Sequence, residues 1–324
     1  MSRKLITIST IMTLMSTSVI ADVPNVAADI APIHSLVSRV MDGVGAPKLI
    51  VQSGASPHGY RLRPSEAKAL QDADHVFWMG EELTPWLDSA IGTLASKASV
   101  TTLLDQQGVI LHDFREGALF EAHDHSAHGD DDHDDHDDHD DHKDHDDHDD
   151  HDDHGSHDPH AWLSPENAKL WLNIIASKLS VSDPENAATY FMNAAAGQAE
   201  IEAMIAEVKA TLKPVQGGKF VVFHDAYQYF ENDFDFYASG AISLGDSSDP
   251  SPARIEKVQK RIRDEGIQCV LAEPQFKKGL VATVMEGSDA TASVIDPLGT
   301  ELETGPKLYT QLIKDMAKTL RNCL

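Results

Sequence analysis

Residues 182–212, SDPENAATYFMNAAAGQAEIEAMIAEVKATL, carry a continuous helical pattern. Apolar residues recur at helical spacing in its second half, at Ile201, Ile205, Val208 and Leu212. The stretch opens with a capping-box pattern and ends before a proline and two glycines. We therefore predict one helix of about 43 Å that joins two parts of the chain as a stiff connector.

Short apolar runs alternate with helical patterns on both sides of this connector. Strand–helix alternation is typical of α/β domains with largely parallel sheets. The sequence thus predicts two similar α/β lobes, each with a mostly parallel central sheet flanked by helices. The N-terminal lobe is expected at 22–181, the linker helix at 182–213 and the C-terminal lobe at 214–324. The expected strands are 23–28, 49–54, 75–79, 219–223, 268–272 and 292–295, and the other expected helices are 64–74, 165–179, 251–265, 280–285 and 306–320.

The N-terminus has the pattern of a secretory signal peptide. Basic residues precede an apolar stretch from Leu5 to Ile20, and Val19-Ile20-Ala21 provides small residues for cleavage. We expect residues 1–21 to be removed on export, which places a soluble protein without a lipid anchor in the periplasm. No other segment is long and apolar enough to span a bilayer.

The two cysteines, Cys269 and Cys323, allow only one intramolecular disulfide. Two unpaired thiols and metal binding are the alternatives that the sequence leaves open.

Residues 121–157 form an insert that is rich in histidine and aspartate and almost free of apolar side chains. Such a composition cannot build a core, so we expect a mobile surface loop inserted in the first lobe. Imidazole and carboxylate both bind divalent transition metals. The insert therefore indicates that a metal matters here, and its candidate auxiliary ligands are His123, His125, His128, His133, His136, His139, His142, His145, His148, His151, His154 and His157.

The chain of 324 residues has a formal net charge of −27. Residues 123–158 contain eighteen Asp and one Lys, so 17 of these 27 charges lie in that stretch and the remainder is moderately acidic. This balance argues against nucleic acid and anionic membranes as partners and suits a protein that attracts cations.

Four isolated residues follow strands or precede a helix, in places where a site can form. His58 and His224 follow expected strands, His160 precedes a capped helix, and Asp296 follows the last expected strand. Ligands gather outside the carboxyl ends of strands in open α/β sheets. Three imidazoles and one carboxylate suit a tetrahedral Zn²⁺ site between the two lobes.

The other histidines outside the insert are expected to be structural or exposed. His34 lies at a helix start, His75 at a strand start and His112 in a loop. Asp158 has the position of a turn former, and it is also placed to support a neighbouring ligand.

Five motifs in order resemble those of the metal-binding subunits of ABC-type zinc importers, the ZnuA-type solute-binding proteins. They are Gly54-Ala55-Ser56-Pro57-His58 with Arg61-Leu62-Arg63-Pro64-Ser65, Asp158-Pro159-His160-Ala161-Trp162-Leu163-Ser164-Pro165, Phe223-His224-Asp225-Ala226-Tyr227, Glu273-Pro274-Gln275-Phe276 and Ile295-Asp296-Pro297-Leu298-Gly299. An acidic, histidine-rich loop just before the second motif fits the same family, and the resemblance covers the whole mature chain.

The resemblance implies zinc between two lobes, held by His58, His160 and His224, with Asp296 or water as the fourth ligand. It also implies one disulfide in the second lobe, between Cys269 and Cys323. The implied function is capture of Zn²⁺ as the transported ligand and its delivery to an inner-membrane ABC permease with a cytoplasmic ATPase. We expect a monomer that is not an enzyme.

Two other functions compete with this interpretation. A secreted zinc hydrolase needs an open metal position and a general base, yet the chain has no His-Glu-x-x-His or Gly-x-Ser-x-Gly motif. A zinc sink or surface adhesin would make the insert the functional part. The insert itself has three possible roles: a weaker auxiliary zinc site, a sensor of zinc sufficiency, or a solvated segment of little consequence.

Overall fold

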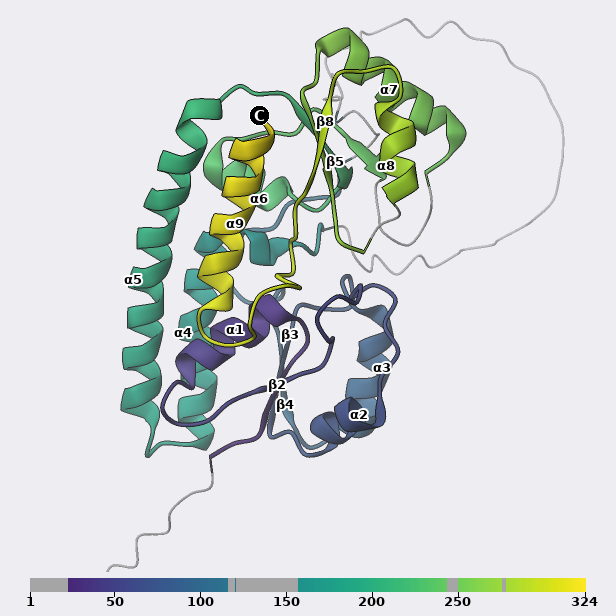
Figure 1. The fold of residues 1–324 in the computed structure, drawn as a ribbon. Coiled ribbons are helices and arrows are strands. Elements are labelled where there is room, and N and C mark those ends of the chain that lie inside the picture. Colours follow the sequence, from purple (N-terminus) through teal and green to yellow (C-terminus); the bar gives the residue numbers. More distant parts are fainter. Residues whose placement is uncertain (1–22, 116–119, 121–156, 244–249, 276–277) are drawn as a thin grey trace, which may run out of the picture.

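The computed structural model describes residues 23–115, 120, 157–243, 250–275 and 278–324. Two α/β lobes lie one above the other, and a group of helices that includes α5 and α9 runs along one side of both (Figure 1). The predicted signal peptide at 1–21 and all the insert histidines except His157 lie outside the described residues.

The N-terminal lobe is built on a four-stranded parallel sheet of order β2-β1-β3-β4. Alternate side chains of β3 enter two different cores: Phe77 packs with α1, whereas Val76 and Trp78 pack with α2 and α3. The sheet is therefore covered on both faces, as its apolar strands predict. Its elements are β1 (Val26–Ala28), α1 (Ala31–Val40), β2 (Lys48–Leu49), α2 (Pro64–Gln71), β3 (His75–Trp78), α3 (Pro85–Leu94) and β4 (Ser99–Thr102).

The C-terminal lobe repeats this plan with a parallel sheet of order β6-β5-β7-β8. Val221 and Phe223 of β5 face α7 and α8, and Phe220 and Val222 face the core that contains α6 and α9. Its elements are β5 (Phe220–His224), α6 (Gln228–Phe234), β6 (Ala241–Ser243), α7 (Pro252–Glu265), β7 (Cys269–Ala272), α8 (Lys278–Met285), β8 (Thr291–Val294) and α9 (Leu308–Cys323).

The connector differs from the prediction at its start. Ser182 is the last residue of α4 (Pro165–Ser182), and the linker helix α5 spans Ala187–Leu212, followed by the short η3 (Lys213–Val215). A proline at 184 ends α4, and the buried Asp183 carboxylate accepts hydrogen bonds from Asn186 Nδ2 and Tyr190 Oη at 2.8 Å each. The capping-box prediction at Ser182 was therefore wrong, because these residues form a corner between two helices.

Helix α5 packs closely on α4, α1 and α9. Ile201, Val208 and Leu212 are buried as the helical spacing predicts. Gly197 lies where a β-carbon would come within 2.9 Å of the Leu172 side chain in α4, so a glycine permits this close approach. The linker is thus a packed part of the molecule.

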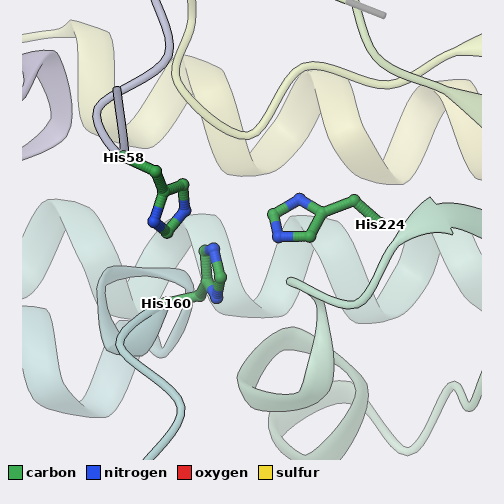
Figure 2. Close-up of side chains that lie close together, drawn as sticks. All are labelled: His58, His160 and His224. Atoms are coloured by element: carbon green, nitrogen blue, oxygen red, sulfur yellow. The ribbon is translucent and has the colours of Figure 1, made fainter. Parts of the chain in front are cut away.

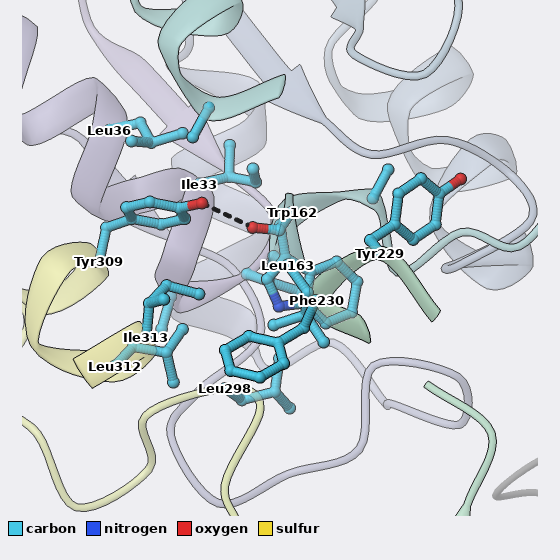
Figure 3. Packing of buried hydrophobic residues seen from close by; sticks show 14 of the residues in the cluster. Ile33, Leu36, Trp162, Leu163, Tyr229, Phe230, Leu298, Tyr309, Leu312 and Ile313 are labelled. Atoms are coloured by element: carbon cyan, nitrogen blue, oxygen red, sulfur yellow. Dashed lines mark hydrogen bonds between the residues drawn. The ribbon is translucent and has the colours of Figure 1, made fainter. Parts of the chain in front are cut away.

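One hydrophobic core joins both lobes (Figure 3). The Tyr309 hydroxyl in α9 donates a hydrogen bond to the Trp162 carbonyl at 2.9 Å, and Trp162 Nε1 donates to the Pro297 carbonyl at 2.8 Å. Trp162 belongs to the short 3₁₀ helix η2 (Ala161–Leu163), which directly follows His160. This shared core fixes the position of one candidate ligand relative to the C-terminal lobe.

Several elements differ from the sequence expectations. Strand β2 covers only Lys48–Leu49, and the predicted strand at 49–54 instead gives way to a turn in which Gly54 has φ +84°. The sequence did not predict β4, β6, α3 or α6, which are short or lack a clear apolar pattern.

The disulfide Cys269–Cys323 is present. Among the described helices, none combines the length and the apolar character needed to cross a membrane.

Candidate metal centre

Three histidines from distant parts of the sequence lie together where the two lobes meet. His58 belongs to the loop after β2, His160 precedes η2, and His224 is the last residue of β5. One ring nitrogen of each lies within 4.8 Å of the others. The structure thus brings together the three histidines that the sequence singled out.

The three imidazole rings face one another (Figure 2). Their centroids are 4.8 Å apart for His160 and His224, 5.5 Å for His58 and His160, and 6.0 Å for His58 and His224. His160 and His224 are 4% exposed, and His58 is half-buried. His58 is therefore the least buried of the three candidate ligands.

The loop that carries His58 is fixed at both of its flanks. The Trp86 indole in α3 donates a hydrogen bond to the Pro57 carbonyl at 2.7 Å. On the other side, the Tyr60 hydroxyl donates to Glu66 Oε1, and the same glutamate accepts from the Arg63 backbone N–H, which caps α2. These contacts tie the ligand loop to α2 and α3.

His160 is oriented by a buried carboxylate two residues earlier. Its Nδ1 lies 2.6 Å from Asp158 Oδ1, and its backbone N–H donates to the same oxygen at 3.0 Å. Burial raises the pKa of Asp158 to about 7, although the backbone hydrogen bond from His160 acts in the opposite direction. Asp158 is therefore both the turn former and the supporting residue that the sequence suggested.

A buried carboxylate also lies next to His224, as Asp158 lies next to His160. Its Nδ1 lies 3.3 Å from Oε1 of Glu273, which is 3% exposed and just after β7. The second oxygen of Glu273 accepts a hydrogen bond from Gln275 Nε2 at 2.7 Å. Sequence analysis did not assign a role to Glu273. Its position just after a predicted strand, at the same sheet edge as His224, was the signal that pointed to it.

Asp296 is not brought into the group of three. Its Oδ1 accepts hydrogen bonds from the backbone N–H groups of Leu298 and Gly299, both at 3.0 Å. Its Oδ2 accepts from the backbone and the hydroxyl of Thr300, at 2.6 and 2.7 Å. The carboxylate closes the turn after β8, which ends at Val294, and both of its oxygens accept hydrogen bonds within this turn.

The remaining histidines have structural contacts. His34 Nε2 pairs with the Pro47 carbonyl at 3.2 Å, and His75 Nε2 lies 2.6 Å from the Ser182 hydroxyl. His112 lies beside α6, where its Nε2 is 3.3 Å from Asn232 Nδ2. His157 is the one insert histidine within the described residues, and it pairs with Asp113 Oδ1 at 2.8 Å.

The arrangement is suited to a divalent transition metal. The Asp158 contact occupies Nδ1 of His160 and leaves Nε2 for coordination. Three neutral imidazoles favour Zn²⁺ over the hard, oxygen-preferring ions, and the buried acids next to the ligands attract a cation. Among the described residues, no other group of three or more His, Cys, Asp or Glu residues has this geometry.

The chain is similar to known proteins of zinc uptake systems. The family model "Zinc-uptake complex component A periplasmic" matches residues 26–323. The high-affinity zinc uptake system protein ZnuA of Brucella abortus (strain 2308) is 48% identical over 304 residues, which is 92% of this chain and 91% of that protein. Its counterpart in Paracoccus denitrificans (strain Pd 1222) is 45% identical over 305 residues, with 94% and 93% covered.

A crystal structure of ZnuA shares the fold. The TM-score is 0.72 at 21% identity, and the match covers 93% of this chain and 99% of that one. The two-lobed α/β architecture predicted from the sequence is confirmed by this likeness.

Proposed function

The chain belongs to the family of periplasmic zinc-uptake components, and we propose that it captures Zn²⁺ in the periplasm and delivers it to an ABC-type permease. The permease would be driven by a cytoplasmic ATPase. The observation that carries this proposal is the convergence of His58, His160 and His224 within 4.8 Å where the lobes meet. Binding of this kind requires no chemical step from the protein, so we propose a monomeric receptor that is not an enzyme.

A water molecule, in our proposal, completes the coordination of zinc. Both oxygens of Asp296 accept two hydrogen bonds each in a turn, so recruiting this carboxylate would leave several backbone N–H groups without partners. The carboxylates of Asp158 and Glu273 are directed at imidazoles. Neither is therefore placed as the general base that a hydrolase would need.

Zinc titration calorimetry tests the site. The double variant H58A/H160A removes two of three ligands and should lower the affinity for Zn²⁺ by orders of magnitude. The variant H112A is the matched control, since it removes a histidine that is outside the group. Wild-type affinity in the double variant would refute the site assignment.

Delivery is tested by zinc uptake in the organism that produces this protein. A strain that carries the H58A/H160A chain should fail to grow under zinc depletion, whereas a strain that carries H112A should grow.

Deleting residues 121–156 should remove a weaker binding phase from the calorimetry and largely preserve uptake, because the main site lies outside the insert. Loss of uptake on this deletion alone would favour the insert as the functional part.

A further inference from the structure

Arg115 is a buried cation of the N-terminal lobe that contacts two buried acids of the C-terminal lobe. Its guanidinium donates to Asp225 through Nε, at 3.0 and 3.1 Å, and through Nη2. It also donates to Glu231 Oε2 through Nη1 at 2.6 Å. The Arg115 side chain is 15% exposed, and those of Asp225 and Glu231 are 7% and 1% exposed. The ring of Phe120 covers the guanidinium, with its centroid 3.6 Å from Cζ.

This ion cluster is connected to two of the three candidate ligands through the chain. Asp225 follows His224, at the end of β5. Arg115 lies three residues after His112, whose carbonyl accepts a hydrogen bond from the N–H of Asp158, the residue that orients His160. A displacement of Arg115 would therefore shift the strand end that carries His224 and the segment that is bonded to Asp158.

The same place is where the described ends of the insert meet. Asp113 and His157 form an antiparallel bridge, and the Asp158 N–H donates to the His112 carbonyl at 2.7 Å. The Tyr229 hydroxyl in α6 donates to the Asp158 carbonyl at 2.7 Å and accepts from the His112 N–H at 3.1 Å. We call residues 112–115 and 157–158 the stem. The stem is thus fastened to the C-terminal lobe by α6 and by Arg115.

Burying three charged groups is costly, and it is compensated only when the geometry is good. The planar fork of arginine bonds each of the two acids through two nitrogens, whereas the ammonium of lysine offers a single nitrogen. The cluster lies beside the ligands and crosses from one lobe to the other. It is therefore placed to fix the distance between His160 and His224.

We propose that Arg115 is a positioning residue that ties the stem to the zinc site and lengthens the time for which zinc stays bound. The inference rests on the proposed function. Arg115 does not touch the metal: it acts through Asp225 on the strand end that carries His224.

Stopped-flow release of zinc into excess chelator tests the proposal on the full mature chain. R115M and R115K should release zinc several-fold faster than wild type, up to about tenfold, since partners bonded directly to a ligand contribute ten- to a hundredfold and Arg115 acts one step further away, through Asp225. The control is R39M, because Arg39 is equally buried and also bonds one acid through two nitrogens, but its partner Glu200 lies in α5. R39M should release zinc within about twofold of wild type.

R115M leaves the buried acids Asp225 and Glu231 without their cation. The variant R115M/D225N/E231Q therefore also removes the negative charges of these two side chains. It should fold stably and still release zinc faster than wild type, and its Co²⁺ complex should show altered visible absorption bands. Wild-type release and bands in a stably folded triple variant would overturn the proposal. If wild-type protein binds zinc but R115M and R39M release it alike, only this inference fails. If wild-type protein binds no zinc, the proposed function fails with it.

Discussion

The carboxylate of Asp158 lies 2.6 Å from Nδ1 of His160, with both side chains at most 5% exposed. Burial raises the pKa of Asp158 to about 7. Above that pH the ionised carboxylate only accepts hydrogen bonds, so Nδ1 carries the proton and the lone pair of Nε2 is left for a metal. The turn that contains Asp158 therefore fixes both the tautomer and the direction of the ligand before zinc arrives.

Asp158→Asn should weaken zinc binding by about ten- to a hundredfold. An amide in this position holds the imidazole less firmly and stabilises the metal-bound ring less than a carboxylate does. Calorimetry at pH 7.5 measures the change. Asp183→Asn is the matched control: Asp183 is also fully buried, but it bonds Tyr190 at the corner between α4 and α5. Equal losses of affinity in the two variants would show that Asp158 acts only on stability.

Asp296→Asn should lower stability and leave zinc affinity almost unchanged. The carboxylate accepts four hydrogen bonds in the turn after β8, and an amide can accept only through its single oxygen. Loss of two such bonds should cost about 1–3 kcal/mol of unfolding free energy. Urea unfolding and zinc titration of the same sample separate the two effects. A large loss of affinity at unchanged stability would instead make Asp296 the fourth ligand.

The sequence predicted the ligands better than it predicted their surroundings. His58 and His224 follow apolar runs that are recognisable as strands, so their places beyond the carboxyl ends of strands in the two sheets follow from α/β topology. Glu273 also follows an expected strand, but nothing near it in the sequence identifies His224 as its partner, and Arg115 has no local signal for its role. Their positions depend on contacts between residues 49 to 116 apart in the chain. Only the packed fold brings these partners together.

Asp296 and Ser182 show a second limit of sequence patterns. Aspartate before Pro-Leu-Gly fits both a ligand after a strand and a turn in which the carboxylate accepts backbone N–H groups, and the structure contains the turn. Ser182 before Asp-Pro-Glu fits a helix start, but the chain uses it as a helix end. In both cases a short polar motif has two local solutions, and tertiary packing selects one.

Removing the disulfide with C269A/C323A should lower stability without affecting the zinc site. The bridge joins the start of β7 to the end of α9 across 54 residues, so loop-closure entropy suggests a loss of about 4 kcal/mol at most. Cys269 pairs with Phe220 at the first residue of β5, whereas His224 is the last residue of that strand. Urea unfolding should show the loss, and zinc titration should give the wild-type affinity. A tenfold weaker affinity would mean that the bridge also supports the ligands.

Ionisation of the buried Asp29 should lower the stability of the metal-free protein as the pH rises from 5 to 8. Its side chain is fully buried after β1 and accepts hydrogen bonds from the Ile30 and Met79 N–H groups, both at 2.7 Å. Burial raises its pKa from 3.8 to about 7, against the effect of these backbone hydrogen bonds. Between these two values the folded state keeps a proton that the unfolded state has lost, so unfolding free energy falls with rising pH until about pH 7.

The variant D29N isolates this contribution, because it cannot titrate while the other groups remain. The unfolding free energy of wild type minus that of D29N should fall between pH 5 and pH 8, by roughly 4 kcal/mol at most over the full interval between the two pKa values. Urea unfolding with a metal chelator present, at several pH values, gives this difference directly. Asp74→Asn is the control substitution, at an exposed aspartate that accepts a hydrogen bond from the Asn25 N–H. A constant difference for D29N would mean that the buried carboxyl is ionised throughout this range and that its two hydrogen bonds offset the cost of burial.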